Sequence, residues 1–170
     1  DNYTRGHSER VANYAEALGG AVGMGRADRK NLRRAGLLHD IGKIGIPLDY
    51  IEKPGPLTHE EYEVVKQHPR IGFEICKPLR TMAPLLLLIR GHHERLDGRG
   101  YPDGLKGEEV PLPLRCLSIS DVYDALTSDR AYRKALPSES ALVIMRQEAS
   151  VGMWDVKLID VFAESVVSKE

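Results

Sequence analysis

Cysteine is scarce in this sequence, with two residues, Cys76 and Cys116, in a chain of 170. Two cysteines so far apart make neither a disulfide framework nor a CxxC metal or redox motif. We therefore expect both to be small buried residues of a protein that works in the reducing cytoplasm.

Long apolar runs are also missing. The longest covers about residues 83–89, whereas a membrane-spanning helix needs ~20 apolar residues. We expect no membrane span in this segment. Because the first residue is Asp1 rather than methionine, we expect the chain to be the C-terminal part of a longer multidomain protein.

Neither sign of charge dominates, since 24 Lys and Arg residues face 25 Asp and Glu residues for a net charge of −1. A broadly basic protein that binds polynucleotides is therefore disfavoured. The apolar share of 42% is enough for a sizeable core, and the length is typical of one domain. We expect residues 1–170 to form a single domain.

Apolar residues recur mostly at helical spacing, and no segment alternates over the length of a strand. Thr58 and Glu61 form a capping-box pattern, and Asp155 is placed to cap the last helix. The nearly all-apolar stretch over residues 82–93 predicts one buried helix. Residues 94–113 hold four glycines and three prolines, which predict a long loop. The expected fold class is all-α.

Histidine is the unusual component, with six residues, two of them adjacent. Candidate metal ligands fall near different predicted helices: His7, His39, Asp40, His68, His92, His93 and Asp121. Seven ligands exceed the needs of one tetrahedral metal, but they suit two metals that share a carboxylate. Taken singly, a histidine is more often a surface or hydrogen-bonded residue than a ligand. His59, in the first turn after Thr58, is expected to be exposed and without function.

Several separated motifs together resemble the HD-GYP domain, a branch of the HD phosphohydrolases. They are His7, HDIGK at 39–43, HP at 68–69, HHERLDGRGYP at 92–102 and DVYDALTSDRAYR at 121–133. The resemblance covers nearly the whole chain and implies an HD-type helical bundle with an extended GYP-containing loop. It implies a metal-dependent phosphodiesterase that hydrolyses cyclic di-GMP through a metal-bridging hydroxide, with either linear pGpG or GMP as the final product.

The same resemblance implies how the ligands divide. One metal would be held by His7, His39, Asp40 and Asp121, and a second by Asp40, His68, His92 and His93. Fe or Mn is favoured, and Zn, Co or Ni is compatible with these ligands. Some family members hold a third metal through a Glu four residues before the first His. Tyr3 occupies that position here, so we expect two metals.

By resemblance, Asp40 and Lys43 would be catalytic residues. The expected substrate contacts are Lys43, Tyr101, Asp124, Arg130 and Arg133. Each has a plainer alternative: a solvated lysine after a helix, a loop that only shields the metals, and a solvated charged turn. Asp124 could also orient a metal ligand instead of touching substrate.

Two other functions stay open at this point. The domain could be a catalytically weak sensor of cyclic di-GMP or of a partner protein, or it could hydrolyse another cyclic dinucleotide. The resemblance further implies a fused N-terminal sensor or receiver domain. Exposed apolar residues on the terminal helices would permit a homodimer.

Overall fold

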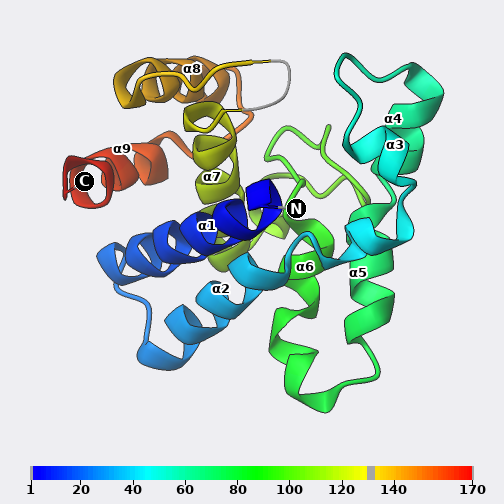
Figure 1. Ribbon diagram of the computed structural model, residues 1–170. Coiled ribbons are helices and arrows are strands. Elements are labelled where there is room, and N and C mark those ends of the chain that lie inside the picture. Colours follow the sequence, from blue (N-terminus) through cyan, green and yellow to red (C-terminus); the bar gives the residue numbers. More distant parts are fainter. Residues whose placement is uncertain (1, 130–132, 170) are drawn as a thin grey trace.

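The computed structural model describes residues 2–129 and 133–169 (Figure 1). The α-helices are α1 (Asn2–Ala21), α2 (Arg26–Leu38), α3 (Leu48–Ile51), α4 (His59–Val65), α5 (His68–Cys76), α6 (Leu86–Gly91), α7 (Leu112–Thr127), α8 (Ser138–Ser150) and α9 (Val156–Ser165). Short 3₁₀-helices are η1 (Ile41–Gly45), η2 (Arg80–Leu85), η3 (Gly107–Glu109) and η4 (Val167–Lys169). No strand is present among these residues, so the all-α prediction is confirmed.

Helices α1 and α2 form an antiparallel pair that is held by a very close approach of their backbones (Figure 1). The apolar stripes predicted from the sequence face each other, and Val11, Leu18 and Leu32 are fully buried. A Cβ on Gly36 would lie 2.6 Å from the Cα of Ala12. Only glycine allows this contact, which brings the end of α2 close to α1.

Helix α7 runs through the middle of the fold and packs against α1, α2, α6 and α8 (Figure 1). Its residues Leu114, Leu117, Ile119 and Tyr123 are almost completely buried. Because apolar residues cover most sides of α7, any polar residue on it must be paired inside the protein. Asp121 is such a residue, and it is 8% exposed.

The backbone of η1 crosses the start of α5 in van der Waals contact. A Cβ on Gly42 would lie 1.8 Å from the carbonyl oxygen of His68 and 2.5 Å from the nitrogen of Gly72. This crossing brings the segment after α2 against the first turn of α5, two regions that are about 30 residues apart in the sequence.

The connecting elements agree with the sequence in part. Thr58 and Glu61 form the predicted capping box, and the Asp155 side chain caps α9 by accepting from the backbone N–H of Leu158. The single helix expected over residues 82–93 is wrong: η2 contains Pro84, and α6 covers only Leu86–Gly91. Proline cannot donate the backbone hydrogen bond that a continuous helix requires there.

Both cysteines are buried and free, as the sequence predicts. None of the helices in the described part of the chain is both long and apolar enough to cross a membrane.

The approach of α1 and α2 makes a direct test of packing. Gly36→Ala should lower the free energy of unfolding by about 1–3 kcal/mol, because the new methyl group meets backbone atoms that no side-chain rotation can move. The change runs against helix propensity, which favours alanine over glycine by ~1 kcal/mol. Gly55→Ala is the control, since nothing lies within 4 Å of a Cβ there. Equal chemical denaturation midpoints for the two variants would contradict this account.

Candidate metal centre

Five segments of the chain bring the seven predicted ligands to one place. His7 lies on α1, His39 and Asp40 follow α2, His68 begins α5, His92 and His93 follow α6, and Asp121 lies on α7. All except His93 are buried, and His93 is partly buried. The helices therefore converge as the sequence predicted, although the five segments are spread from residue 7 to residue 121.

Asp40 lies between two groups of histidines. Its Oδ1 is 3.3 Å from Nε2 of His68 and 3.9 Å from Nε2 of His92. Its Oδ2 is 3.5 Å from Nε2 of His39 and 3.7 Å from Nε2 of His7. One carboxylate oxygen thus faces each group, as a bridging ligand requires.

Three of the histidine rings are oriented by backbone carbonyl groups at helix ends. The Nδ1 of His39, His68 and His92 donates to the carbonyl of the residue three positions earlier, Gly36, Val65 and Ile89, at 2.8 Å in each case. These carbonyls lie in the last turns of α2, α4 and α6, where the helix itself offers no partner. A hydrogen on Nδ1 leaves the lone pair on Nε2, which points toward Asp40.

His7 is oriented differently, by a side chain. Its Nδ1 donates to Oδ2 of Asp124 at 2.7 Å, while its Nε2 lies 3.3 Å from Oδ1 of Asp121. Each of these four rings therefore donates through Nδ1 to a carboxylate or a backbone carbonyl. Histidines that ligate metals usually have this kind of support.

The donor atoms fit a metal. The Nε2 atoms of His68 and His92 lie 3.2 Å apart, and because both rings donate through Nδ1, two lone pairs face each other. A cation between them would turn this repulsion into attraction. Ligand atoms within 4.8 Å of one another form the groups His7, His39 and Asp121, then His68, His92 and His93, and also His39, Asp40 and His92.

The charges in the cluster are strongly perturbed. Burial would raise the pKa of Asp40, but the charges of His39 and Lys43 hold it well below its usual value. Burial lowers the pKa of His93 to about 4 and, with neighbouring histidines, lowers that of His92. Burial also lowers the pKa of His7, but the hydrogen bonds to Asp121 and Asp124 outweigh it and raise the pKa to about 9.

Lys43 lies beside the bridging carboxylate. Its Nζ donates to Oδ2 of Asp40 at 2.5 Å, and its side chain is 32% exposed. The turn of η1 places it there, one residue after the tightly packed Gly42. The ammonium group therefore contacts both the cluster and the solvent.

The loop between α6 and α7 places Tyr101 directly over the cluster. Its ring stacks on His93 with centroids 4.8 Å apart, and the Nζ of Lys66 lies 5.5 Å from its centroid. Burial and the nearby carboxylates raise the pKa of the Tyr101 hydroxyl, so it stays neutral. A Cβ on Gly100 would meet the backbone of Glu94 and Arg95 at 2.5 Å, so glycine lets the loop fold back on itself here.

Glu94 anchors this loop, a role that the sequence reasoning missed. The residue is 1% exposed, and its carboxylate accepts from the backbone N–H groups of Asp103, Gly104 and Leu105 at 2.7, 3.1 and 2.9 Å. Arg90 adds a two-point ion pair with Asp103. The available signal was a glutamate directly after the two adjacent histidines of the predicted metal site, because a charged residue drawn into the interior with them needs partners of its own.

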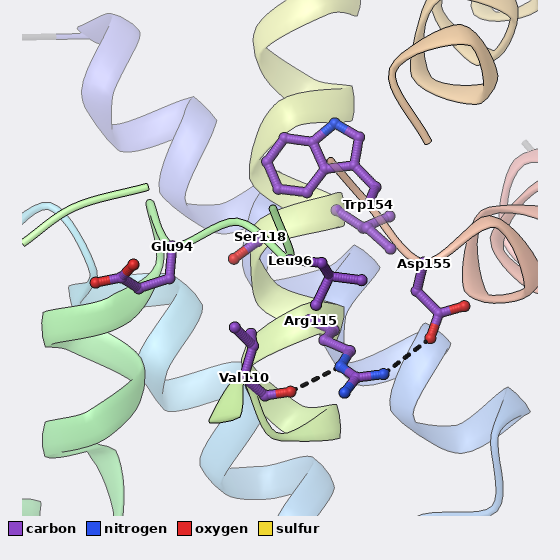
Figure 2. A pocket seen from close by; sticks show the side chains of 8 residues that line it. Glu94, Leu96, Val110, Arg115, Ser118, Trp154 and Asp155 are labelled. Atoms are coloured by element: carbon purple, nitrogen blue, oxygen red, sulfur yellow. Dashed lines mark hydrogen bonds and ion pairs between the residues drawn. The ribbon is translucent and has the colours of Figure 1, made fainter. Parts of the chain in front are cut away.

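The other side of the loop is tied down at a small cavity of about 10 Å³, which leaves room for at most one water molecule. Figure 2 shows Arg115 between the carbonyl of Val110 and the carboxylate of Asp155, at 2.7 and 3.2 Å. Trp154 and Leu96 line the same cavity. The cavity is distinct from the metal cluster and contributes to holding the loop.

The remaining expected contacts lie near the C-terminal end of α7. Asp124 is fully buried and bonded to His7 and Arg10, which favours the orienting alternative for this residue. A guanidinium nitrogen of Arg133 donates to the carbonyl of Ala125. Arg130 and the side chain of Tyr3 lie outside the described residues. His59 is exposed, as predicted.

Comparison with known proteins identifies the family. A family model described as HD domain matches residues 2–158. The chain belongs to the HD domain family. The family assignment drawn from the spaced motifs is thereby confirmed.

Curated relatives include the 3'3'-cGAMP-specific phosphodiesterase 3 of Vibrio cholerae serotype O1, which is 43% identical over 145 residues and 85% of this chain. The cyclic di-GMP phosphodiesterase response regulator RpfG of Xanthomonas campestris is 37% identical over 163 residues and 94% of this chain. The chain spans only 32% and 43% of the lengths of these two relatives.

A solved structure shares the fold. An HDG"Y"P protein from Bdellovibrio bacteriovorus superposes with a TM-score of 0.80 over 98% of this chain and 53% of its own, at 21% identity. The HD-type helical arrangement expected from the sequence is therefore confirmed.

The protonation of His7 predicts a proton release. In the metal-free protein His7 has a pKa of about 9 and is charged at pH 7, whereas His92 and His93 are already neutral. A histidine must lose this proton before it can ligate a metal. Metal binding at pH 7 should therefore release about one proton from His7. The release should show as a dependence of the calorimetric enthalpy on the ionisation enthalpy of the buffer, and a buffer-independent enthalpy would contradict it.

Removing the charge of Glu94 should loosen the loop. In Glu94→Gln an NH2 group replaces one of the two carboxylate oxygens that together accept three backbone N–H groups. Because an NH2 group cannot accept, the variant should lower the free energy of unfolding by about 1–3 kcal/mol. Amide hydrogen exchange at residues 103–105 should become faster. The control is Glu109→Gln in the same loop, since Glu109 is exposed and accepts from one backbone N–H. Unchanged exchange in Glu94→Gln would show that the loop is held by other contacts.

Proposed function

We propose that this chain is the catalytic domain of a metal-dependent phosphodiesterase that hydrolyses cyclic dinucleotides, with cyclic di-GMP as the main substrate and linear pGpG as the first product. The observation that carries the proposal is the position of Asp40, with one oxygen toward His68 and His92 and the other toward His7 and His39. A single structural metal would not need a carboxylate between two groups of ligands.

Two divalent metals fit these ligands. His7, His39 and Asp121 would hold one, and His68, His92 and His93 the other, with Asp40 shared. Iron or manganese suits the mixture of imidazole and carboxylate best, and Zn, Co or Ni is compatible with it. When bound, such a pair would lower the pKa of a water molecule and neutralise charge on the phosphoryl oxygens.

The protein groups around the metals would bind and orient the substrate. Lys43 can exchange its contact with Asp40 for a phosphate oxygen, where its charge would stabilise the charge that develops on that group. It can also donate a proton to the leaving 3' oxygen. Tyr101, stacked on His93 at the mouth of the cluster, offers a ring to stack on guanine and a neutral hydroxyl to donate to phosphate.

Arginine side chains after α7 would grip the second phosphate of the dinucleotide. Arg133 keeps donor groups beyond the one that reaches Ala125, and a guanidinium can bind a phosphate at two points. We assign Arg130 the same role from the sequence alone. Asp124 would support this end of the site by orienting His7 rather than by meeting substrate.

Two alternatives concern the substrate and the turnover. The relatives named above include enzymes for cyclic di-GMP and for 3'3'-cGAMP, so another cyclic dinucleotide is the second candidate. A sensor that binds without turnover is less favoured, because all seven ligands are present and converge. The near-zero net charge argues against a polynucleotide.

The chain would work as one part of a larger cytoplasmic protein. We propose a fused N-terminal sensor or receiver domain and a single catalytic domain over residues 1–170. Apolar residues exposed on α8 and α9, Val143 and Val156 among them, are compatible with a homodimer.

The proposal is tested by turnover. The purified domain, loaded with Mn²⁺ or Fe²⁺ under reducing conditions, is mixed separately with cyclic di-GMP, 3'3'-cGAMP and cyclic di-AMP, and linear products are separated by chromatography. We expect hydrolysis of cyclic di-GMP. Binding of cyclic di-GMP without any product from a metal-loaded domain would favour the sensor alternative, and preference for another dinucleotide would change the substrate.

A substitution of Asp40 tests whether this site carries the activity. Asp40→Asn should lose more than about 100-fold in activity and should lose bound metal as well, because replacing even a residue behind the ligands typically costs 10–100-fold. Asp49→Asn is the control, since Asp49 is exposed on the neighbouring helix α3. Full activity of Asp40→Asn would overturn the assignment of the site.

A further inference from the structure

Arg10 lies one helical turn after His7 on the same face of α1, and both side chains reach α7. The guanidinium holds the carboxylate of Asp124 at two points: Nε donates to Oδ1 at 2.5 Å and Nη2 to Oδ2 at 3.1 Å. Its Nη2 also donates to Oγ of Ser128 at 2.9 Å. Two-point contacts of this kind fix the plane of a carboxylate as well as its position.

Asp124 in turn fixes His7. Its Oδ2 accepts from Nδ1 of His7 at 2.7 Å, and the hydroxyl of Ser128 donates to the same oxygen at 3.3 Å. Asp124 is 0% exposed, so its charge needs the cation that Arg10 supplies. Both oxygens are occupied inside the protein, which leaves the residue little capacity to bind a ligand directly.

His7 needs this side-chain support because of where it lies. His39, His68 and His92 are each oriented by a carbonyl at a helix end. His7 lies inside α1, which continues to Ala21, so the carbonyls before it are engaged in the helix. Its Nδ1 is instead bonded to the carboxylate of Asp124.

We propose that Arg10 is a positioning residue for the metal at His7, His39 and Asp121, acting through Asp124 on the His7 ring. The inference rests on the proposed two-metal function and assigns a role to a residue that is not itself one of the predicted metal ligands. Arg10 is 43% exposed in its side chain, so it can be changed without opening the core.

The test is the metal content of Arg10→Met, which keeps much of the aliphatic side chain and removes the guanidinium group that holds Asp124 at two points. Because only one group of ligands depends on His7, we expect the variant to bind one metal tightly and the other about 10–100-fold more weakly. Calorimetry and elemental analysis measure this loss. Turnover should recover when free metal is raised, with little change in KM for the dinucleotide. Arg10→Lys keeps the positive charge but not the two-point contact, so it should lose less metal affinity than Arg10→Met.

The control is Arg33→Met. Arg33 is 44% exposed, contacts Asn13 and lies 3.4 Å from Glu16 of α1, at a distance from the cluster along the helix. It matches Arg10 in exposure and in linking a helix to α1. We expect this variant to bind both metals with the affinity of the unmodified domain.

Two results would overturn the inference: an Arg10→Met variant that binds both metals with unchanged affinity, or one that loses both equally together with a fall in thermal stability. The second result would mean that Arg10 only stabilises the fold. If Arg10→Met does not fold, Arg10→Lys and Ser128→Ala are judged by the same criteria. Failure of the unmodified domain to bind metal or to hydrolyse a cyclic dinucleotide would instead count against the proposed function.

Discussion

The position of one carboxylate, Asp40, is the constraint on which the rest of the structure depends. It must be buried, ionised and reachable by imidazoles from both sides. The backbone crossing at Gly42 provides this by bringing the segment after α2 into contact with the first turn of α5. The approach at Gly36 draws in α1 and with it His7. Two glycines without side chains thus determine how closely the two halves of the cluster can meet.

Gathering so many polar groups in the interior is unfavourable unless each has a partner. In this fold the buried polar groups have partners of different kinds. Backbone carbonyls orient His39, His68 and His92, while the side chain of Asp124 orients His7. Lys43 neutralises Asp40 on its solvent side. The lone pairs that remain without a donor are those that face the space between the ligands, where a cation would be most stable.

Much of the site could be predicted from the sequence because five of the seven ligands lie at helix ends, next to breaks that are visible in the sequence, such as Gly42 after Asp40 and Pro69 after His68. The roles of the residues that support the ligands and the loop could not be predicted in the same way. Glu94 reads as one more charged loop residue, and its burial depends on how residues 103–105 return to it. Arg10 and Asp124 are 114 positions apart, so their pairing depends on the packing of α1 against α7. The break at Pro84 was visible in the sequence, but the apolar character of its surroundings outweighed it.

The carbonyls that orient three of the rings belong to helices that stop just there. A helix that continued for another turn would supply N–H groups to Gly36, Val65 and Ile89 and would leave the rings of His39, His68 and His92 free to rotate. The length of α2, α4 and α6 is therefore itself a determinant of the site. Lengthening any of these helices by a single turn would disturb the chemistry of the cluster even if every ligand were kept.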